Sequence, residues 1–527
     1  MPLSGVAANF RFDRETLLTL TVLVAATALP RMAVAWRRDT LCSDAVYYIE
    51  RAADFERGDF TAAFGDLRLN AYVVLLAAVH AAGVPWESAG ELISLACSSL
   101  VVLPLFGWAR RVFCQRVATL ACLLYAFHPE AIEWSGDGIR DPIFWLMSML
   151  TLYCGWRATS MDGWGWFVAA ALALTVSVLT RFDGWLLLLP LSIWLVRPWR
   201  DAPRWRVHLA VGLFVCLAAY PALLLVANVT WLRDRAEWEW GRFYHLRIVG
   251  NYVQSLVDTD ATQSDAVGRQ SPAVVSAVST RQLAWGFGHT LVRGMRETYV
   301  VLLLAGAVAA RRWPRGPAPF SPIVLAAATA LGMWIVFWYS HETTKRYAVL
   351  VLLPLLPVAA IGLESLVALV PHQFVRFPVG SPRGALVGIA VCMFAVVGSY
   401  DALASRYHSR ELRAELGRWI EREFGSGRSM FCSKNLDRLV GYYARGNHRE
   451  ISPAMPPDVL TATIHHEKPD LVVLWTETTS RESLRTVAAS SAQLGLVRID
   501  AARLPAGCDR VALYCRNELV AASRISR

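Results

Sequence analysis

The first residues suited to catalysis are Asp44, Tyr47 and Tyr48, in the stretch LCSDAVYYIERAADF that follows the first long apolar run. If this stretch is helical, the three side chains share one face, because residues three and four positions apart are neighbours on a helix. A carboxylate placed there can accept the proton of an attacking hydroxyl. The same residues also suit a helix at a membrane surface, with Asp44 as its N-cap and the tyrosines in an aromatic belt.

A second group of ionisable residues lies in the stretch HPEAIEWSGDGIRDPIFW. Its members are His128, Glu130, Glu133, Asp137, Arg140 and Asp141. Asp141 is followed by proline and is therefore also a favourable helix start, with its carboxylate on the positive end of the helix dipole. Capping accounts for Asp141 alone, whereas a solvated rim would account for the whole group.

Cationic side chains follow at two later positions in the chain. Arg181 and Asp183 lie between two apolar runs, and His341, Lys345 and Arg346 precede another. Ionisable groups at membrane depth are candidates for function. An ion pair closing a tight turn, or side chains snorkelling from helix ends, would give the same residues. Together, carboxylates and cations predict transfer of a group from an amphiphilic phosphate, because cations stabilise the phosphate that leaves.

The composition indicates which class of protein carries these groups. Of the 527 residues, 55% are hydrophobic and only 18% charged, and several stretches of about 20 residues are almost uncharged. The net charge of +10 comes from arginines in short segments between apolar runs, which favours topology signals over nucleic-acid binding. Ten scattered cysteines form no CxxC motif. We therefore expect a polytopic membrane protein with no metal, no cofactor and no nucleic-acid partner.

The apolar runs predict about eleven transmembrane helices. They cover 16–36, 88–109, 117–134, 141–157, 164–180, 183–197, 207–228, 295–310, 319–340, 346–369 and 384–403. The run 69–83 is too short to span and suits an interfacial helix. The first run also resembles a secretory signal, but we expect it to be an uncleaved helix with its N-terminus in the cytoplasm.

Arginine-dense short loops then fall on the cytoplasmic side, as the positive-inside rule requires. The outer side receives the loops 37–87 and 229–294, with an interfacial helix at 231–256, and everything after residue 404. If 69–83 were a full span, every later loop would lie on the opposite side of the membrane. The active site and the tail are thus predicted on the outer side of the cytoplasmic membrane.

The tail changes character from residue 404 onward. ELRAELGRWIEREFG has a helical period, while RSMFC, DLVVLW, GLVRID and RVALYC are short β-rich runs. The predicted fold class is therefore mainly α, a polytopic α-helical membrane protein with interfacial helices and a small C-terminal α/β domain. We assign a transmembrane catalytic domain to 1–403 and an extracytoplasmic α/β domain to 404–527.

The motifs, taken in order, resemble the GT-C class of polytopic glycosyltransferases that use polyprenyl-phosphate sugars. They are Asp-x-x-Tyr-Tyr at 44–48, GDF at 58–60, WARRVF at 108–113, HPE and RDPIFW within 128–145, LTRFDGWLLLLP at 179–190 and KRYAVLVLLPLLP at 345–357. The resemblance covers roughly residues 15 to 400 and is closest to the branch with aminoarabinose and protein O-mannosyl transferases. It implies that Asp44 is the catalytic aspartate, flanked by Tyr47 and Tyr48, and that Asp141 opens the fourth span. The chain departs from the pattern at Ala45, where many members carry a second acidic residue.

The predicted function is transfer of a hexosyl or pentosyl group from a polyprenyl-phosphate donor to an acceptor outside the membrane. Asp44 and Asp141 are the predicted catalytic residues. The predicted substrate-binding residues are Tyr47, Tyr48, His128, Arg140, Arg181, His341, Lys345 and Arg346. The alternatives are a transporter or lipid flippase, in which these charges would line a path, and an inactive scaffold that presents the tail. The sequence shows no inverted repeat, which argues against the transporter hypothesis.

The predicted topology can be tested with the native thiols. Cys114 should react with a membrane-impermeant thiol reagent only after the cell is opened, and Cys508, if unpaired, should react from outside. The reverse pattern would mean that 69–83 spans the membrane.

Overall fold

The structure, a computed structural model, describes residues 13–64, 69–160, 164–191, 280–309, 320–340, 345–370, 382–404, 408–433, 436–451, 455–476 and 479–522. The chain divides into two compact units. A helical unit comprises Met1–Ala35, Asp54–Val84 and Glu91–Ala404. An α/β unit comprises Trp36–Ala53, Pro85–Gly90 and Ser405–Arg527. The part of the predicted first outer loop that contains Asp44 therefore belongs to the same unit as the tail.

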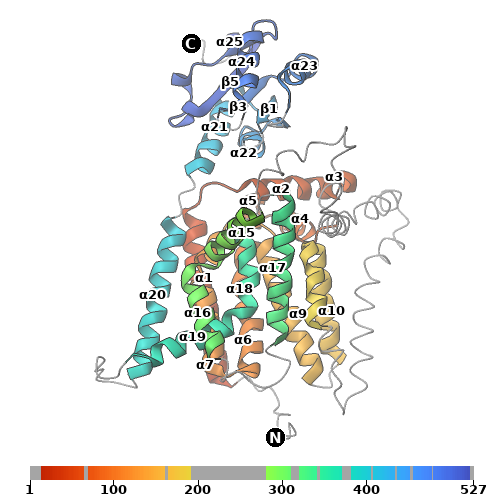
Figure 1. The fold of residues 1–527 in the computed structure, drawn as a ribbon. Helices are drawn as coiled ribbons and strands as arrows, with labels where there is room; N and C mark the ends of the chain where they lie inside the picture. Colours follow the sequence, from red (N-terminus) through yellow and green to blue (C-terminus); the bar gives the residue numbers. More distant parts are fainter. Residues whose placement is uncertain are drawn as a thin grey trace, which may run out of the picture. The chain divides into compact units, whose positions relative to one another are not determined.

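The described elements up to residue 404 are nearly all helical (Figure 1). They are α1 (Arg14–Arg37), α2 (Ser43–Glu56), α3 (Phe60–Phe64), α4 (Ala71–Ala81), α5 (Trp86–Leu100), α6 (Val102–Val112), α7 (Gln115–Ala126), α8 (Pro129–Ser135), α9 (Asp141–Ser160), α10 (Trp164–Thr180), η1 (Phe182–Leu187), α15 (Thr280–Met295), α16 (Glu297–Val308), α17 (Phe320–Ser340), α18 (Arg346–Leu352), η4 (Leu353–Leu355), α19 (Leu356–Ala368) and α20 (Pro382–Ala404). Among them α6 packs against α7, α9 against α10, and α16 against α19.

Four helical segments of the described chain are long and apolar enough to cross a membrane. They are Arg14–Arg37, Trp86–Val112, Arg346–Leu369 and Gly384–Ala404. Shorter apolar helices are Ala71–Ala81, Gly165–Thr180, Glu297–Val308 and Ile323–Trp334. The predicted class, a mainly helical polytopic membrane protein, is confirmed. The predicted span 207–228 and the predicted helix 231–256 lie outside the described residues. Of the predicted span 183–197 the structure describes 183–191, and of the predicted loop 229–294 it describes the part from residue 280.

One predicted span is interrupted in the structure. The run 117–134 divides into α7 and α8, because His128 is extended, with φ −72° and ψ 119°, immediately before Pro129. A proline disfavours helical backbone at the preceding residue and removes one helical N–H, so the break occurs there. The short run 69–83 forms α4, whose 11 residues rise only about 16 Å, roughly half the hydrocarbon thickness.

The tail folds into a five-stranded mixed sheet with helices (Figure 1). Its elements are α21 (His408–Phe424), β1 (Ser429–Ser433), α22 (Asp437–Tyr443), β2 (Asn447–Ile451), α23 (Pro457–Glu467), β3 (Leu471–Trp475), α24 (Arg481–Ser490), β4 (Leu496–Arg498), η6 (Ala501–Arg503), η7 (Cys508–Arg510), β5 (Val511–Arg516) and α25 (Asn517–Ala522). The strand order is β2-β1-β3-β5-β4. β1 is parallel to β2 and β3, whereas β5 is antiparallel to β3 and β4. The predicted α/β character is confirmed, and the four β-rich runs became β1, β3, β4 and β5.

The sheet buries both faces, as the alternation along its strands requires. Met430 and Cys432 of β1 belong to one core with α21 and α22, whereas Phe431 belongs to a second core with α23 and α24. β2 was not predicted, because its sequence NHREI is polar and it lies at the edge of the sheet.

The predicted reactivity of Cys508 is wrong, because the thiol is fully buried in the α/β unit. Cys114 is exposed and keeps its part in the topology test. The outer arm of that test needs a cysteine introduced at an exposed position such as Ala489 of α24.

Two glycines allow α16 and α19 to cross at close range. A Cβ added to Gly362 would lie 1.9 Å from the carbonyl oxygen of Leu302, and one added to Gly306 would lie 2.1 Å from that of Val358. Small residues let helix backbones approach in this way, which favours packing between helices in a membrane. The contact joins one candidate span, Arg346–Leu369, to the shorter apolar helix α16.

We expect Gly362→Ala to destabilise the helical unit by about 1–3 kcal/mol, the usual cost of overpacking, because the added methyl meets backbone and cannot rotate away. Melting of the purified protein in detergent measures this. Gly388→Ala in α20 is the control, since nothing lies within 4 Å of its added Cβ. Equal melting temperatures for the two variants would contradict the close crossing.

Candidate functional site

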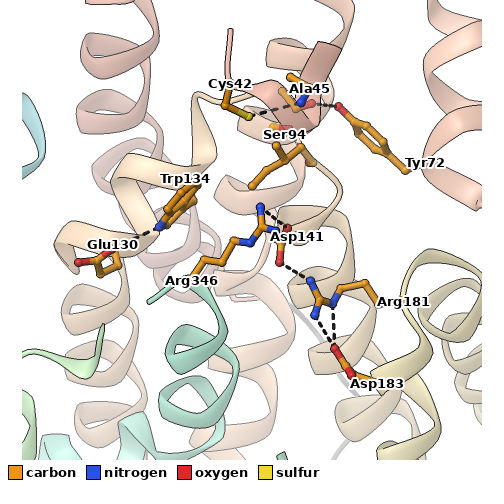
Figure 2. Close-up of polar contacts among 12 residues, drawn as sticks. Cys42, Ala45, Tyr72, Ser94, Glu130, Trp134, Asp141, Arg181, Asp183 and Arg346 are labelled. Atoms are coloured by element: carbon orange, nitrogen blue, oxygen red, sulfur yellow. Dashed lines mark hydrogen bonds and ion pairs between the residues drawn. The ribbon is translucent and has the colours of Figure 1, made fainter. Parts of the chain in front are cut away.

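The centre of the helical unit's polar cluster is a buried ion pair between Asp141 and Arg181 (Figure 2). Arg181 follows the last residue of α10 and Asp141 is the first residue of α9. Nη1 of Arg181 donates to Oδ1 of Asp141 at 2.8 Å, and the two side chains are 8% and 3% exposed. The remaining nitrogens, Nε and Nη2, donate to Oδ2 of Asp183 at 3.0 and 2.5 Å. One guanidinium therefore joins two carboxylates.

Arg346 adds a second cation beside Asp141. Its Nη1 lies 3.8 Å from Oδ2 of Asp141, too far for a hydrogen bond, and that buried oxygen has no hydrogen-bond partner in the described part of the chain. Its guanidinium stacks on Trp134 at 5.5 Å, and both Arg346 and Arg181 lie over the ring of Tyr347. Aromatic faces stabilise guanidinium groups without neutralising them. The cluster keeps cationic groups close to a buried carboxylate with unused acceptor capacity.

The segment that begins α4 and the middle of α5 support the two turns that carry this cluster. Tyr72 of α4 donates from its hydroxyl to the carbonyl of Gly138 at 2.5 Å, and Ser94 of α5 donates to that of Ile139 at 2.9 Å, just before Asp141 (Figure 2). Nδ2 of Asn70 donates to the carbonyl of Thr180, the residue before Arg181. Sequence reasoning missed Asn70, Tyr72 and Ser94, since single polar residues in apolar runs give no pattern.

Glu130 lies in a second polar group, near the beginning of α8. Trp134 donates to it at 3.2 Å (Figure 2), and Arg296 lies 3.5 Å from its Oε1 and 3.7 Å from Asp401. Arg296 has φ +66°, an unfavourable value for a side chain of this size. Trp134 therefore contacts both polar groups, one through Arg346 and the other through Glu130.

The remaining predicted residues of the helical unit differ in their surroundings. His128 is buried, and its ring nitrogens lie 3.3 Å from the N–H of Ala131 and 3.2 Å from the carbonyl of Met295. Lys345 is exposed, Arg140 is half-buried, and His341 lies outside the described residues. The substrate-binding roles of these residues stay predictions.

Asp44, Tyr47 and Tyr48 belong to the α/β unit. The helix α2 begins at Ser43, so Asp44 lies inside the first turn, where a carboxylate favours the helix dipole. Tyr48 is buried, and two guanidinium groups, of Arg51 and Arg438, lie over the ring of Tyr47 at 5.1 and 4.3 Å. The two tyrosine rings are 6.0 Å apart.

Arg31 is a buried charge that sequence reasoning missed, inside the first candidate span. Its guanidinium donates to the carbonyls of Tyr125 and Ala126, which end α7, and to the hydroxyl of Ser135 in α8. The last carbonyls of a helix lack internal partners and attract cations. Arg31 therefore ties α1 to α7 and α8. An arginine within an apolar run was the available signal.

No metal site accompanies these groups in the part of the chain that the structure describes. There, no three His, Cys, Asp or Glu side chains lie where they could hold a metal ion together. Guanidinium groups are well suited to phosphate, so Arg181 and Arg346 stay the predicted residues for binding an anion.

Comparison with known proteins identifies the fold. A family described as dolichyl-phosphate-mannose-protein mannosyltransferase matches residues 74–231, less than a third of the chain. No curated protein sequence matches this chain.

Two of the similar solved structures match most of this chain. ArnT from Cupriavidus metallidurans, bound to undecaprenyl phosphate, has 16% identity and a TM-score of 0.57, with 94% of this chain and 97% of that chain covered. The oligosaccharyltransferase AglB from Archaeoglobus fulgidus, in complex with an inhibitory peptide and a dolichol-phosphate, has 12% identity and a TM-score of 0.55, with 89% and 70% covered. The chain therefore has the fold of the GT-C class of polytopic membrane glycosyltransferases, and the resemblance predicted from the motifs is confirmed.

Asp141→Asn should destabilise the protein strongly, by about 3–5 kcal/mol, because it leaves the buried Arg181 without one of its anions. Asp183→Asn should cost about 1 kcal/mol or less, because Asp183 is 40% exposed and its charge is screened by solvent. Thermal melting of the two purified variants compares them. A larger loss for Asp183→Asn would refute the assignment of Asp141 as the central anion.

Proposed function

We propose that this protein is a membrane glycosyltransferase that moves a sugar from a polyprenyl-phosphate donor to an acceptor outside the cytoplasmic membrane. The observation that carries the proposal is the buried cluster of Asp141, Arg181 and Arg346 beside apolar helices on a GT-C fold. Buried cations near the ends of membrane helices suit a lipid phosphate, whose charge lies at the edge of the bilayer while its chain lies within it.

The similar proteins support a lipid-linked donor. ArnT holds undecaprenyl phosphate, AglB holds a dolichol-phosphate, and the matching family is named for dolichyl-phosphate-mannose. By analogy, the donor proposed for this chain is a hexose or pentose joined to a polyprenyl phosphate.

The proposed step exchanges one bond at the anomeric carbon. The oxygen of an acceptor hydroxyl forms a bond to that carbon, while the bond between the carbon and the phosphate oxygen breaks. The hydroxyl proton passes to the carboxylate of Asp44, and the electron pair leaves with the polyprenyl phosphate. Arg181 and Arg346 stabilise the departing phosphate, and Asp141 holds both cations in place.

The test supplies purified protein in nanodiscs with a polyprenyl-phospho-sugar or the matching nucleotide sugar, and with heat-inactivated envelope extract as acceptor. We expect consumption of the lipid-linked donor alone.

Asp44→Asn should reduce turnover about 10²–10⁴-fold, because the amide cannot accept the proton. Arg346→Ala should impair the reaction more than Arg116→Ala, whose arginine is 58% exposed and paired with Glu364.

Two outcomes would overturn the proposal. Efficient use of the nucleotide sugar without any lipid carrier would remove the donor assignment. Movement of labelled lipid across a sealed vesicle, without any sugar transfer, would favour a flippase instead.

A further inference from the structure

The α/β unit contains more than the C-terminal sheet. It also includes Trp36–Ala53, with Asp44, and the short segment Pro85–Gly90. These pieces lie more than 300 residues before the sheet in the sequence, so specific contacts must hold them. A helix of the length of α2, 14 residues, is marginal in water by itself. Its order therefore depends on what it packs against.

Helix α22 supplies several of these contacts. Arg438 lies over the ring of Tyr47 at 4.3 Å. Tyr443 accepts a hydrogen bond from the backbone N–H of Leu41 at 3.0 Å, two residues before α2 begins. Tyr442, one position earlier, hydrogen-bonds to Glu87, and burial, with the help of that carboxylate, raises the pKa of Tyr442. One seven-residue helix thus contacts both early segments.

Neighbouring elements of the sheet domain complete the attachment. Nη2 of Arg418, in α21, donates to the carbonyl of Asp39 at 2.9 Å, and its guanidinium lies over the ring of Tyr443. Nε2 of His448, in β2, lies 4.0 Å from Oε1 of Glu50. Burial lowers the pKa of His448, and the carboxylate of Glu50 opposes that shift.

The ring of His448 can pack against α22 because position 441 is a glycine. A Cβ at Gly441 would lie 2.4 Å from that ring. The contacts therefore engage both sides of the predicted catalytic aspartate along the chain, Asp39 and Leu41 before it and Tyr47 and Glu50 after it.

We propose that the C-terminal domain is a positioning element for the first outer segment, with Arg438 and Tyr443 as positioning residues that hold α2, and with it Asp44, in the orientation used for transfer. This inference rests on the proposed function of Asp44. The individual contacts are weak, since a cation–π pair and one hydrogen bond each change an equilibrium only several-fold. The attachment is therefore adjustable, and removing one contact should lower the rate without unfolding the unit.

The experiment compares Arg438→Met with Arg445→Met in the full-length protein. Arg445 is the control because it follows α22 and is 76% exposed, paired with Glu421. We expect Arg438→Met to lower kcat about 3- to 30-fold at a nearly unchanged KM for the lipid donor, and to speed amide hydrogen exchange within residues 39–53. Arg438→Lys should recover part of both, and Arg445→Met should change neither. Tyr443→Phe should speed exchange at Leu41 specifically.

A variant pair separates positioning from simple structural damage. In an Asp44→Asn background, Arg438→Met should add no further loss to the residual rate, because it acts through Asp44. A full additional loss would overturn the positioning role. Unchanged exchange and unchanged kcat in Arg438→Met, with Asp44→Asn inactive, would overturn this inference alone. Normal turnover by Asp44→Asn would overturn the proposed base and this inference with it, whatever the exchange data show.

Discussion

A guanidinium group buried among apolar helices needs an anion or several carbonyl oxygens as partners, because the desolvation free energy of an unpaired buried charge would destabilise the fold. Arg181 meets this constraint with Asp141 and Asp183. Arg31 meets it with the carbonyls of Tyr125 and Ala126, the last two residues of α7. In both cases the charge fixes the place where separate helices begin or end, so packing of the helical unit depends on these pairings.

The turns that carry the polar cluster need support of their own, because each lies between apolar helices and has no regular structure. Tyr72 and Asn70 of the α4 segment provide hydrogen bonds to the residues before Asp141 and Arg181. A helix too short to cross the membrane thereby becomes useful as a support for the site. The stacking of Arg346 on Trp134 and Tyr347 acts similarly, since it orients a cation while leaving its charge available.

The α/β unit uses a different balance of forces. Its two cores lie on opposite faces of one sheet and supply its stability, while the attachment of the first outer segment uses single hydrogen bonds and cation–π contacts. Such contacts specify geometry more than they add stability, which suits a segment that carries the proposed base Asp44. The strained backbone at Arg296 is a second place where geometry is favoured over stability, here to pair one arginine with Glu130 and Asp401.

The sequence alone determined the elements that composition and hydrophobic period specify, which are the apolar helices and the β-rich runs that became β1, β3, β4 and β5. It also showed the aspartates and arginines that lie between the apolar helices. It also marked Arg181 beside Asp183, since their separation is two residues. It did not reveal β2, a polar edge strand whose only strand neighbour in the sheet is β1, nor the pairing of Asp141 with Arg181 across 40 positions. It could not connect Leu41 with Tyr443, 402 residues apart. Those pairings depend on distances between elements, which only the packed chain sets.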